Sequence, residues 1–205
     1  MKTSPDIATI ETTKALLQAV HFGSYRKIEE IIASGFDVNT PNKEGMCALM
    51  VASCQNLKKT MKKLLSAGAK VDKEDNQGNT ALHYTVKSPE LDHSMDAFDI
   101  LLKAGADLEA RNHAGQTPLC ALLELMSSTE NKVDKGHTAL FLRMMDKGAN
   151  PYAKDNAQKS PMSLYPACAK SMPEADFKIV QAVFEHIELT RKTQLNASAG
   201  RSLRL

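Results

Sequence analysis

The sequence predicts an all-α solenoid of stacked helix-turn-helix units with projecting β-turn fingers. Two observations support this fold class: two short motifs recur along the chain, and they alternate in a fixed order. The composition agrees, because aromatic residues make up only 5% of the 205 residues and Trp is absent, which disfavours a strand-rich protein. A repeat pattern decides how every local segment is assigned.

The first motif reads EGMCAL at 44–49 and returns as QGNTAL at 77–82 and as AGQTPL at 114–119. A fourth copy, AQKSPM at 157–162, has Gln in place of the glycine. From Gly45 in the first copy to Gly78 in the second, the interval is about 33 residues, a period typical of a structural repeat. The next two intervals are longer, which indicates insertions in the later units.

The second motif alternates with the first and also occurs four times, as IIASGFDVN, LLSAGAKVD, LLKAGADLE and MMDKGANPY. Its successive intervals equal those of the first motif. The intervals between copies lengthen by the same amounts for both motifs. Each insertion therefore lies within one repeat, after its first motif and before its second. The insertions are therefore expected near 88–92 and 127–136. Such loops can carry specificity or can be tolerated decoration, and the sequence leaves both open.

Both motifs resemble those of the ankyrin repeat family, whose unit of about 33 residues has a TPLH-like element and a later LLxxGAxxN-like element. GNTALH at 78–83 and GQTPL at 115–119 are close to the first element, and LLKAGADLEARN at 101–112 is close to the second. The resemblance covers residues 12–189, about five repeats. It implies an ankyrin-repeat solenoid whose finger tips and first helices form a concave binding face.

The physical chemistry of each unit supports this resemblance. Thr80 and Thr117 lie where a first helix begins, and a Thr side chain can cap the free backbone N–H groups there. Pro118 follows at the first helical position, where proline is tolerated. The second helices have apolar residues at helical spacing, such as Phe98 and Leu101, and end at a glycine suited to a left-handed cap. One helix pair cannot bury its apolar face alone, so neighbouring units must stack.

In chain order, we expect an extension at 1–11, an ankyrin repeat domain at 12–189 with repeats near 12–40, 41–73, 74–110, 111–153 and 154–189, and a basic flexible tail at 190–205. Helices are expected at 12–21 and 25–34, 47–55 and 57–66, 80–87 and 93–103, and 117–126 and 138–146. The first repeat is an N-terminal cap because it lacks the Thr-Pro start. The last is a degenerate cap whose helices are interrupted or bounded by Pro166 and Pro173.

Charge and cysteine usage narrow the function classes. The formal net charge of +2 gives no general attraction to nucleic acid or to an anionic membrane. The four cysteines form no CxxC pair, so the sequence indicates neither a disulfide framework nor a metal site, and no cofactor is expected. No apolar run has the length of a membrane span.

The same features give expectations about cellular setting. The N-terminal segment MKTSPDIATIETTK has no apolar core of a secretory signal, and a reducing setting follows from the cysteine usage. We therefore expect a cytoplasmic protein, or one delivered to a host cell by a route that needs no signal. In isolation it is expected to be a monomer.

His83 lies in the segment DNQGNTALHYT with Asp75 and Thr80, residue types that also build catalytic sites. The sequence offers no further nucleophile or acid partner in a catalytic pattern. The resemblance implies instead that this histidine links neighbouring loops by hydrogen bonds, while Asp75 and Thr80 serve the turn and the helix cap. We therefore expect no enzymatic activity.

A lysine cluster, LKKTMKK, provides the competing binding hypothesis. Lys58, Lys59, Lys62 and Lys63 lie opposite apolar residues on one expected helix, and could bind nucleic acid as a cationic stripe. A solvated outer face is favoured, because acidic residues balance the charge elsewhere and stacking aromatics are missing nearby. Nucleic-acid binding stays as an alternative.

The resemblance implies binding of a partner protein, with the chain acting as an adaptor or inhibitor. An alternative role is a secreted effector or phage-borne inhibitor that blocks a host enzyme. Motif phasing places candidate contact residues on the finger tips and on the inner-helix slots, with Phe22, Met46 and Leu125 as apolar positions expected to face solvent. The concave-face set is His21, Phe22, Lys43, Glu44, Met46, Gln55, Asn76, Gln77, Asn79, Lys87, His113, Gln116, Glu124 and Leu125.

Overall fold

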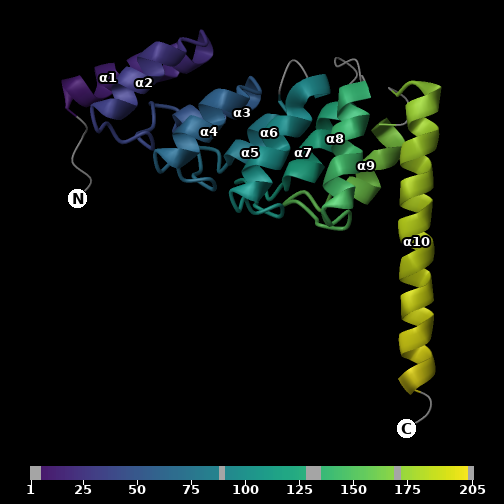
Figure 1. The fold of residues 1–205 in the computed structure, drawn as a ribbon. Coiled ribbons are helices and arrows are strands. Elements are labelled where there is room, and N and C mark those ends of the chain that lie inside the picture. The colour runs from purple at the N-terminus through teal and green to yellow at the C-terminus, as the bar shows by residue number, and fades with distance from the viewer. Residues whose placement is uncertain (1–5, 88–90, 128–134, 169–171, 203–205) are drawn as a thin grey trace.

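The computed structural model describes residues 6–87, 91–127, 135–168 and 172–202, with all of their side chains except those of 91–94 and 194–202. Within these ranges the chain forms ten helices and no strand, which confirms the all-α class. The helices follow one another along an elongated stack (Figure 1). They are α1 (Ile7–His21), α2 (Tyr25–Ala33), α3 (Ala48–Cys54), α4 (Lys58–Ser66), α5 (Ala81–Thr85), α6 (Leu91–Lys103), α7 (Pro118–Ser127), α8 (Lys135–Asp146), α9 (Pro161–Cys168) and α10 (Glu174–Ser202).

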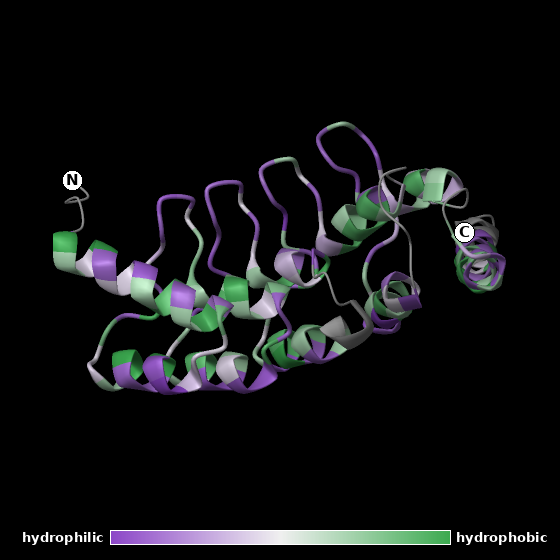
Figure 2. Ribbon diagram, turned by 90° about the horizontal axis from the view of Figure 1, so that it is seen from above, coloured by the Kyte–Doolittle hydropathy of each residue, from purple (hydrophilic) through white to green (hydrophobic). Residues whose placement is uncertain are grey.

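The stack has two layers. First helices, from α1 to α9, form one row and second helices, from α2 to α8, form the other, while the loops between repeats project beside the first row (Figure 2). The core lies between the rows, where each repeat contributes fully buried residues such as Leu49 and Leu82 from first helices and Met61 and Leu101 from second helices. Burying one such side chain contributes roughly 1.5–3 kcal/mol.

The projecting loops are the expected fingers, defined here as finger 1 (41–47), finger 2 (74–80), finger 3 (111–117) and finger 4 (154–160). A β-turn closes each one, as when the Gly45 backbone N–H donates to the Asn42 carbonyl at 3.0 Å. The side chain of Asn42 supports this turn because its Oδ1 accepts from the backbone N–H groups of Glu44 and Met46 at 3.1 and 2.8 Å. The acidic or amide residue at the start of each finger therefore sets the loop's shape.

Neighbouring fingers are bonded in series. In fingers 2, 3 and 4, one backbone N–H donates to a carbonyl of the finger before: Asn76 to Glu44 at 3.1 Å, His113 to Gln77 at 2.8 Å, and Asn156 to Ala114 at 2.9 Å. These approaches explain why fingers 1, 2 and 3, each followed by another finger, have a glycine, whereas finger 4 has Gln158 at that position. At Gly78, where φ is +77°, an added Cβ would lie 2.7 Å from the His113 backbone nitrogen.

Several helix starts differ from the sequence-based expectation. The helix α1 begins at Ile7 and not near residue 12, because Asp6 caps it by accepting from the Thr9 backbone N–H at 2.7 Å. The extension expected at 1–11 is therefore largely helical where it is described. The expected insertions near 88–92 and 127–136 lie mostly outside the described residues, and α6 and α8 begin within their ends.

The segment from residue 190, expected as a basic flexible tail, is helical as far as Ser202, where it forms the C-terminal part of α10. The first half of α10 packs on the stack through Val180 and Phe184, which are buried. Arg191 lies over the Tyr152 ring at 4.4 Å, beyond the expected end of the repeat domain. No Pro or Gly interrupts 174–199, so nothing in the sequence ends the helix sooner. Figure 1 shows α10 projecting past the other helices.

Candidate protein-binding surface

The candidate surface is the concave face formed where the fingers meet the first helices. Its central part is a pocket of about 390 Å³ between fingers 2 and 3 and helices α5 and α7. Six of the residues predicted from the sequence meet there, which brings together positions from 76 to 116 in the chain. The pocket is lined by Asn76, Gln77, Asn79, Lys87, Asn112, His113, Ala114, Gln116 and Ala121.

Two cationic or ionisable groups lie exposed at this central pocket. Lys87 follows α5, and its ammonium lies 5.0 Å from the centre of the Tyr84 ring. His113 is exposed at the tip of finger 3, while its backbone N–H is held by Gln77. Gln116 donates from Nε2 to Glu124, so the finger and the first helix α7 are joined at the pocket's floor. The arrangement offers polar recognition and no reactive group.

Asn79 corrects one expectation, because it is buried and not a surface contact. It is 3% exposed, and its Nδ2 donates to Asp75 Oδ2 at 3.1 Å. Its Oδ1 accepts from Asn112 Nδ2 at 3.2 Å, across to the next finger. The finger folds back on itself through Asp75, so a residue that motif phasing placed at the tip points inward. Its first role is therefore to hold two fingers together.

The three apolar positions expected to face solvent divide into two kinds. Phe22 is 74% exposed, as expected. Met46 and Leu125 are only half exposed, and Met46 packs against the hydrophobic core. Met46 thus shares its surface between the core and solvent, and its role as a contact residue stays a prediction.

His21, Phe22 and Gln55 form a separate group at the other end of the first helices. Gln55 Nε2 and His21 Nδ1 are 2.8 Å apart, and this bond joins α3 to α1. The Phe22 ring meets the His21 ring edge-on at a centroid distance of 5.0 Å. Phe22 thus contacts one neighbouring ring and leaves most of its own surface exposed, which suits an interface anchor.

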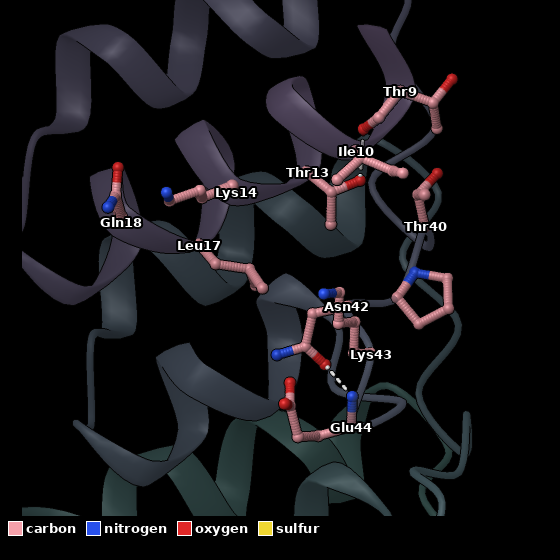
Figure 3. Close-up of a pocket in the computed structure, with 11 residues that line it drawn as sticks. Thr9, Ile10, Thr13, Lys14, Leu17, Gln18, Thr40, Asn42, Lys43 and Glu44 are labelled. Carbon is pink, nitrogen blue, oxygen red and sulfur yellow. Dashed lines mark hydrogen bonds between the residues drawn. The ribbon is translucent and has the colours of Figure 1, made fainter. Parts of the chain in front are cut away.

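Lys43 and Glu44 line a third region, a pocket of about 460 Å³ between finger 1 and the first half of α1. Figure 3 shows Ile10, Thr13 and Leu17 on the α1 side and Asn42, Lys43 and Glu44 on the finger side. Motif phasing does not predict the α1 side of this pocket, because the first finger motif of the sequence begins only at Glu44 and residues 1–11 are expected outside the repeat domain. Asp6, a residue type favoured as a helix N-cap, was the available signal.

His83 proves to be structural, as the resemblance implied. Its Nδ1 accepts from the Thr80 backbone N–H at 3.2 Å, and its Nε2 lies 3.0 Å from the Gln116 carbonyl in the next finger. Burial lowers the pKa of the His83 imidazole, so the ring is neutral at pH 7. Asp75 is engaged as well, because it accepts from the Tyr84 hydroxyl at 2.7 Å. Asp75, Thr80 and His83, the residue types that could suggest a catalytic site, thus form hydrogen bonds that hold the fold together.

The cysteines are four free thiols of low reactivity. Burial raises the pKa of Cys120 to about 11 and that of Cys168 to about 12, so neither is a thiolate at neutral pH. In the described part of the chain, no three His, Cys, Asp or Glu side chains gather as a metal site would need. Nor does any described helix combine the length and apolarity of a membrane span.

The lysine stripe on α4 is partly neutralised by its neighbours. Lys58 pairs with Asp96 on α6, and Lys63 Nζ lies 3.0 Å from Glu29 Oε1 on α2. Lys59 and Lys62 are exposed. Because the pairs link adjacent repeats across the outer row, half of the stripe serves as inter-repeat contact, which weakens the nucleic-acid alternative.

Comparison with known proteins agrees with this architecture. A family model described as ankyrin repeats (3 copies) matches residues 16–112. The Escherichia coli K12 ankyrin repeat protein YahD is 27% identical over 177 residues, which cover 72% of this chain and 86% of YahD. The Drosophila Notch protein is 38% identical over 94 residues, or 45% of this chain, and the Drosophila palmitoyltransferase Hip14 is 31% identical over 101 residues, or 49%.

The chain spans only 3% of Notch and 15% of Hip14, so those likenesses concern the repeats and not the activities of the whole proteins. The matched segment includes fingers 1 and 2, and the same two motifs continue beyond it in finger 3 and α8. The family match, the two motifs and the helical stack together place this chain among the ankyrin repeat proteins.

Proposed function

We propose that this chain binds a partner protein through its concave face and acts without enzymatic chemistry, as an adaptor or an inhibitor. Ankyrin repeats are in general protein–protein interaction modules. The central pocket carries the proposal, because it gathers Gln77, Lys87 and His113 from two fingers and the end of α5. The free thiols suit a reducing compartment, and we place the protein in the cytoplasm or, by a route that needs no signal, in a host cell.

Preorganisation of the face is the physical basis of the proposal. Each finger is closed by its own turn, and fingers 2, 3 and 4 are each bonded to the finger before them, so the surface exists before a partner arrives. A surface that is already ordered loses little conformational entropy on binding, which leaves more of the contact energy as affinity. The hydrogen-bonded fingers therefore favour rigid docking.

The experiment is affinity purification with mass spectrometry on three forms of the protein. The site variant combines Gln77→Glu, Lys87→Glu and His113→Glu, all exposed at the central pocket. The control combines Lys59→Glu and Lys62→Glu on the outer face of α4, which removes the same net charge. Partners captured by the wild type and the control, and lost with the site variant, support the proposal. Capture that survives in a folded site variant contradicts it.

A further inference from the structure

The N-terminal end of the finger series is open. Lys43 holds the position in finger 1 that Asn76 holds in finger 2, one repeat later, and that His113 and Asn156 hold in fingers 3 and 4. In those three fingers the backbone N–H donates to a carbonyl of the preceding finger. Among the described residues, none accepts from the Lys43 backbone N–H. One donor of the series is therefore available on the side that faces α1.

A pocket occupies the place where a preceding finger would lie. It measures about 460 Å³ and is lined largely by apolar surface, with Ile10 and Leu17 from α1 and Pro41 from finger 1. Ile10 is 46% exposed, a large side chain to leave to solvent. The volume lies within the range of protein ligand pockets and suits one or two apolar side chains. Figure 3 shows that Ile10, Leu17 and Lys43 border the same space.

The charges around the pocket favour an acidic occupant. Lys14 on α1 and Lys43 on finger 1 line it, against the single carboxylate of Glu44 among its lining residues. Two ammonium groups beside an apolar groove attract a ligand that carries carboxylates next to an apolar side chain. In the later fingers, the N–H that corresponds to that of Lys43 donates to a backbone carbonyl. A ligand that takes the place of a preceding finger should therefore present a backbone carbonyl to Lys43.

From these three observations we infer that the pocket between α1 and finger 1 binds an extended segment of the partner protein, in which an apolar residue is flanked by acidic residues. The segment takes the place of a missing finger: its carbonyl accepts from the Lys43 N–H, its apolar side chain enters between Ile10 and Leu17, and its carboxylates face Lys14 and Lys43. This inference rests on the proposed function and states the chemistry of the partner at one end of the concave face.

The first test selects a phage-displayed library of random linear peptides on the wild-type protein, and then titrates the most enriched synthetic peptide into ¹⁵N-labelled protein. We expect the enriched sequences to pair an apolar residue with Asp or Glu. We also expect the Lys43 amide signal to be among those that shift on titration, because that N–H becomes hydrogen-bonded. Enrichment of sequences without acidic residues, or no enrichment, would overturn the inference.

The second test isolates the Lys43 donor. Lys43 is the second residue of the turn closed by Asn42 and Gly45, a position that accepts proline. Lys43→Ala and Lys43→Pro both remove the ammonium, but only proline removes the N–H. The selected peptide should bind Lys43→Pro about tenfold more weakly than Lys43→Ala. Equal affinities of Lys43→Ala and Lys43→Pro for the peptide would show that the Lys43 N–H donates to no peptide carbonyl.

The apolar contact is tested by Ile10→Glu, with Ile179→Glu as its control, because Ile179 is equally exposed at 46% but lies on α10. Loss of peptide binding with Ile10→Glu alone supports the inference. Peptides that bind Ile10→Glu normally but not the central-pocket variant would overturn this inference and leave the proposed function intact. Self-association of the wild type in sedimentation, abolished by Ile10→Glu, would assign the pocket to a second copy and overturn it as well.

Discussion

His83 shows how one buried side chain joins two repeats. Its ring is fully buried, with Nδ1 accepting from the Thr80 backbone N–H. Nε2 therefore carries the proton and donates to the Gln116 carbonyl in the next repeat. Protonating Nδ1 would break the bond to Thr80 and bury a charge, so the neutral ring is the form compatible with the fold.

This arrangement predicts a pH dependence of stability. The pKa of His83 is lowered in the folded protein, while in the unfolded chain it is about 6.5. Below that value the unfolded chain takes up the proton first, so the free energy of unfolding should fall as pH drops from 7 to 5. Urea unfolding at several pH values should show a flatter slope for His83→Gln, which also loses about 1–3 kcal/mol at pH 7.

The matched control is His113→Gln, at an exposed histidine. Its slope should equal that of the wild type. A wild-type slope that survives in His83→Gln would show that another group causes the acid sensitivity, and that the Thr80–His83–Gln116 link contributes nothing to it.

At the scale of the element, α10 differs most from what the sequence indicates. Phe184 is 3% exposed, and its ring lies 4.7 Å from that of Tyr165 on α9 and 5.3 Å from that of Phe141 on α8. Three aromatic rings from successive helices thus close the C-terminal end of the stack. This cluster replaces the regular repeat contacts that the degenerate fifth unit lacks.

Phe184→Ala should therefore remove the packing that holds α10 to the stack. Deleting a buried phenylalanine ring costs about 3–5 kcal/mol. We expect chemical denaturation to show a loss in that range. Phe177→Ala is the comparison, because this ring stacks on Tyr165 at 6.0 Å but remains partly exposed, and its loss should cost less. Equal losses of stability in Phe184→Ala and Phe177→Ala would contradict the inference that Phe184 contributes most of the packing of α10 on the stack.

The elements also show which parts of the fold can be predicted from the sequence. Thr80, Thr117 and Pro118 mark helix starts through local bonds, so those boundaries follow from the residues themselves. The same local logic fails for Asn79, whose direction depends on Asp75 within its own finger and on Asn112 in the next. Local signals also leave open where α10 ends, because polar composition predicts exposure and does not predict whether a helix ends.

The candidate binding surface was predictable in outline for a similar reason. Motif phasing predicts that Gln77, Lys87 and His113 lie exposed on one face, and all three are exposed at the central pocket, since each repeat has the same turn and helix start. That they contact a partner stays a prediction. It cannot place the pocket beside α1, because that pocket exists where the periodic pattern stops. A repeat pattern describes the interior of a stack, and the ends of the stack depend on residues such as Ile10 that lie outside the pattern.

At the scale of the whole molecule, the stack is a one-dimensional array in which each repeat contacts its neighbours. The links are the finger bonds, the His83–Gln116 bond and ion pairs such as Lys63 with Glu29. Stability is then a sum of the stabilities of single repeats and of the interfaces between neighbours. A central repeat has two such interfaces and a terminal repeat has one. A destabilising substitution in a central repeat should therefore weaken both of its neighbours, whereas one in a terminal repeat should weaken only one neighbour.

Hydrogen exchange can measure this difference with Leu82→Ala in the central helix α5 and Phe184→Ala in the terminal helix α10. Both side chains are buried, and both changes cost several kcal/mol. For Leu82→Ala, amide protection should fall in α3, α5 and α7 together, because α5 supports both neighbours. For Phe184→Ala, protection should fall in α9 and α10 and stay at the wild-type level in α3, because terminal repeats can open alone. A uniform loss along the whole stack in Phe184→Ala would mean that the repeats unfold as one cooperative unit.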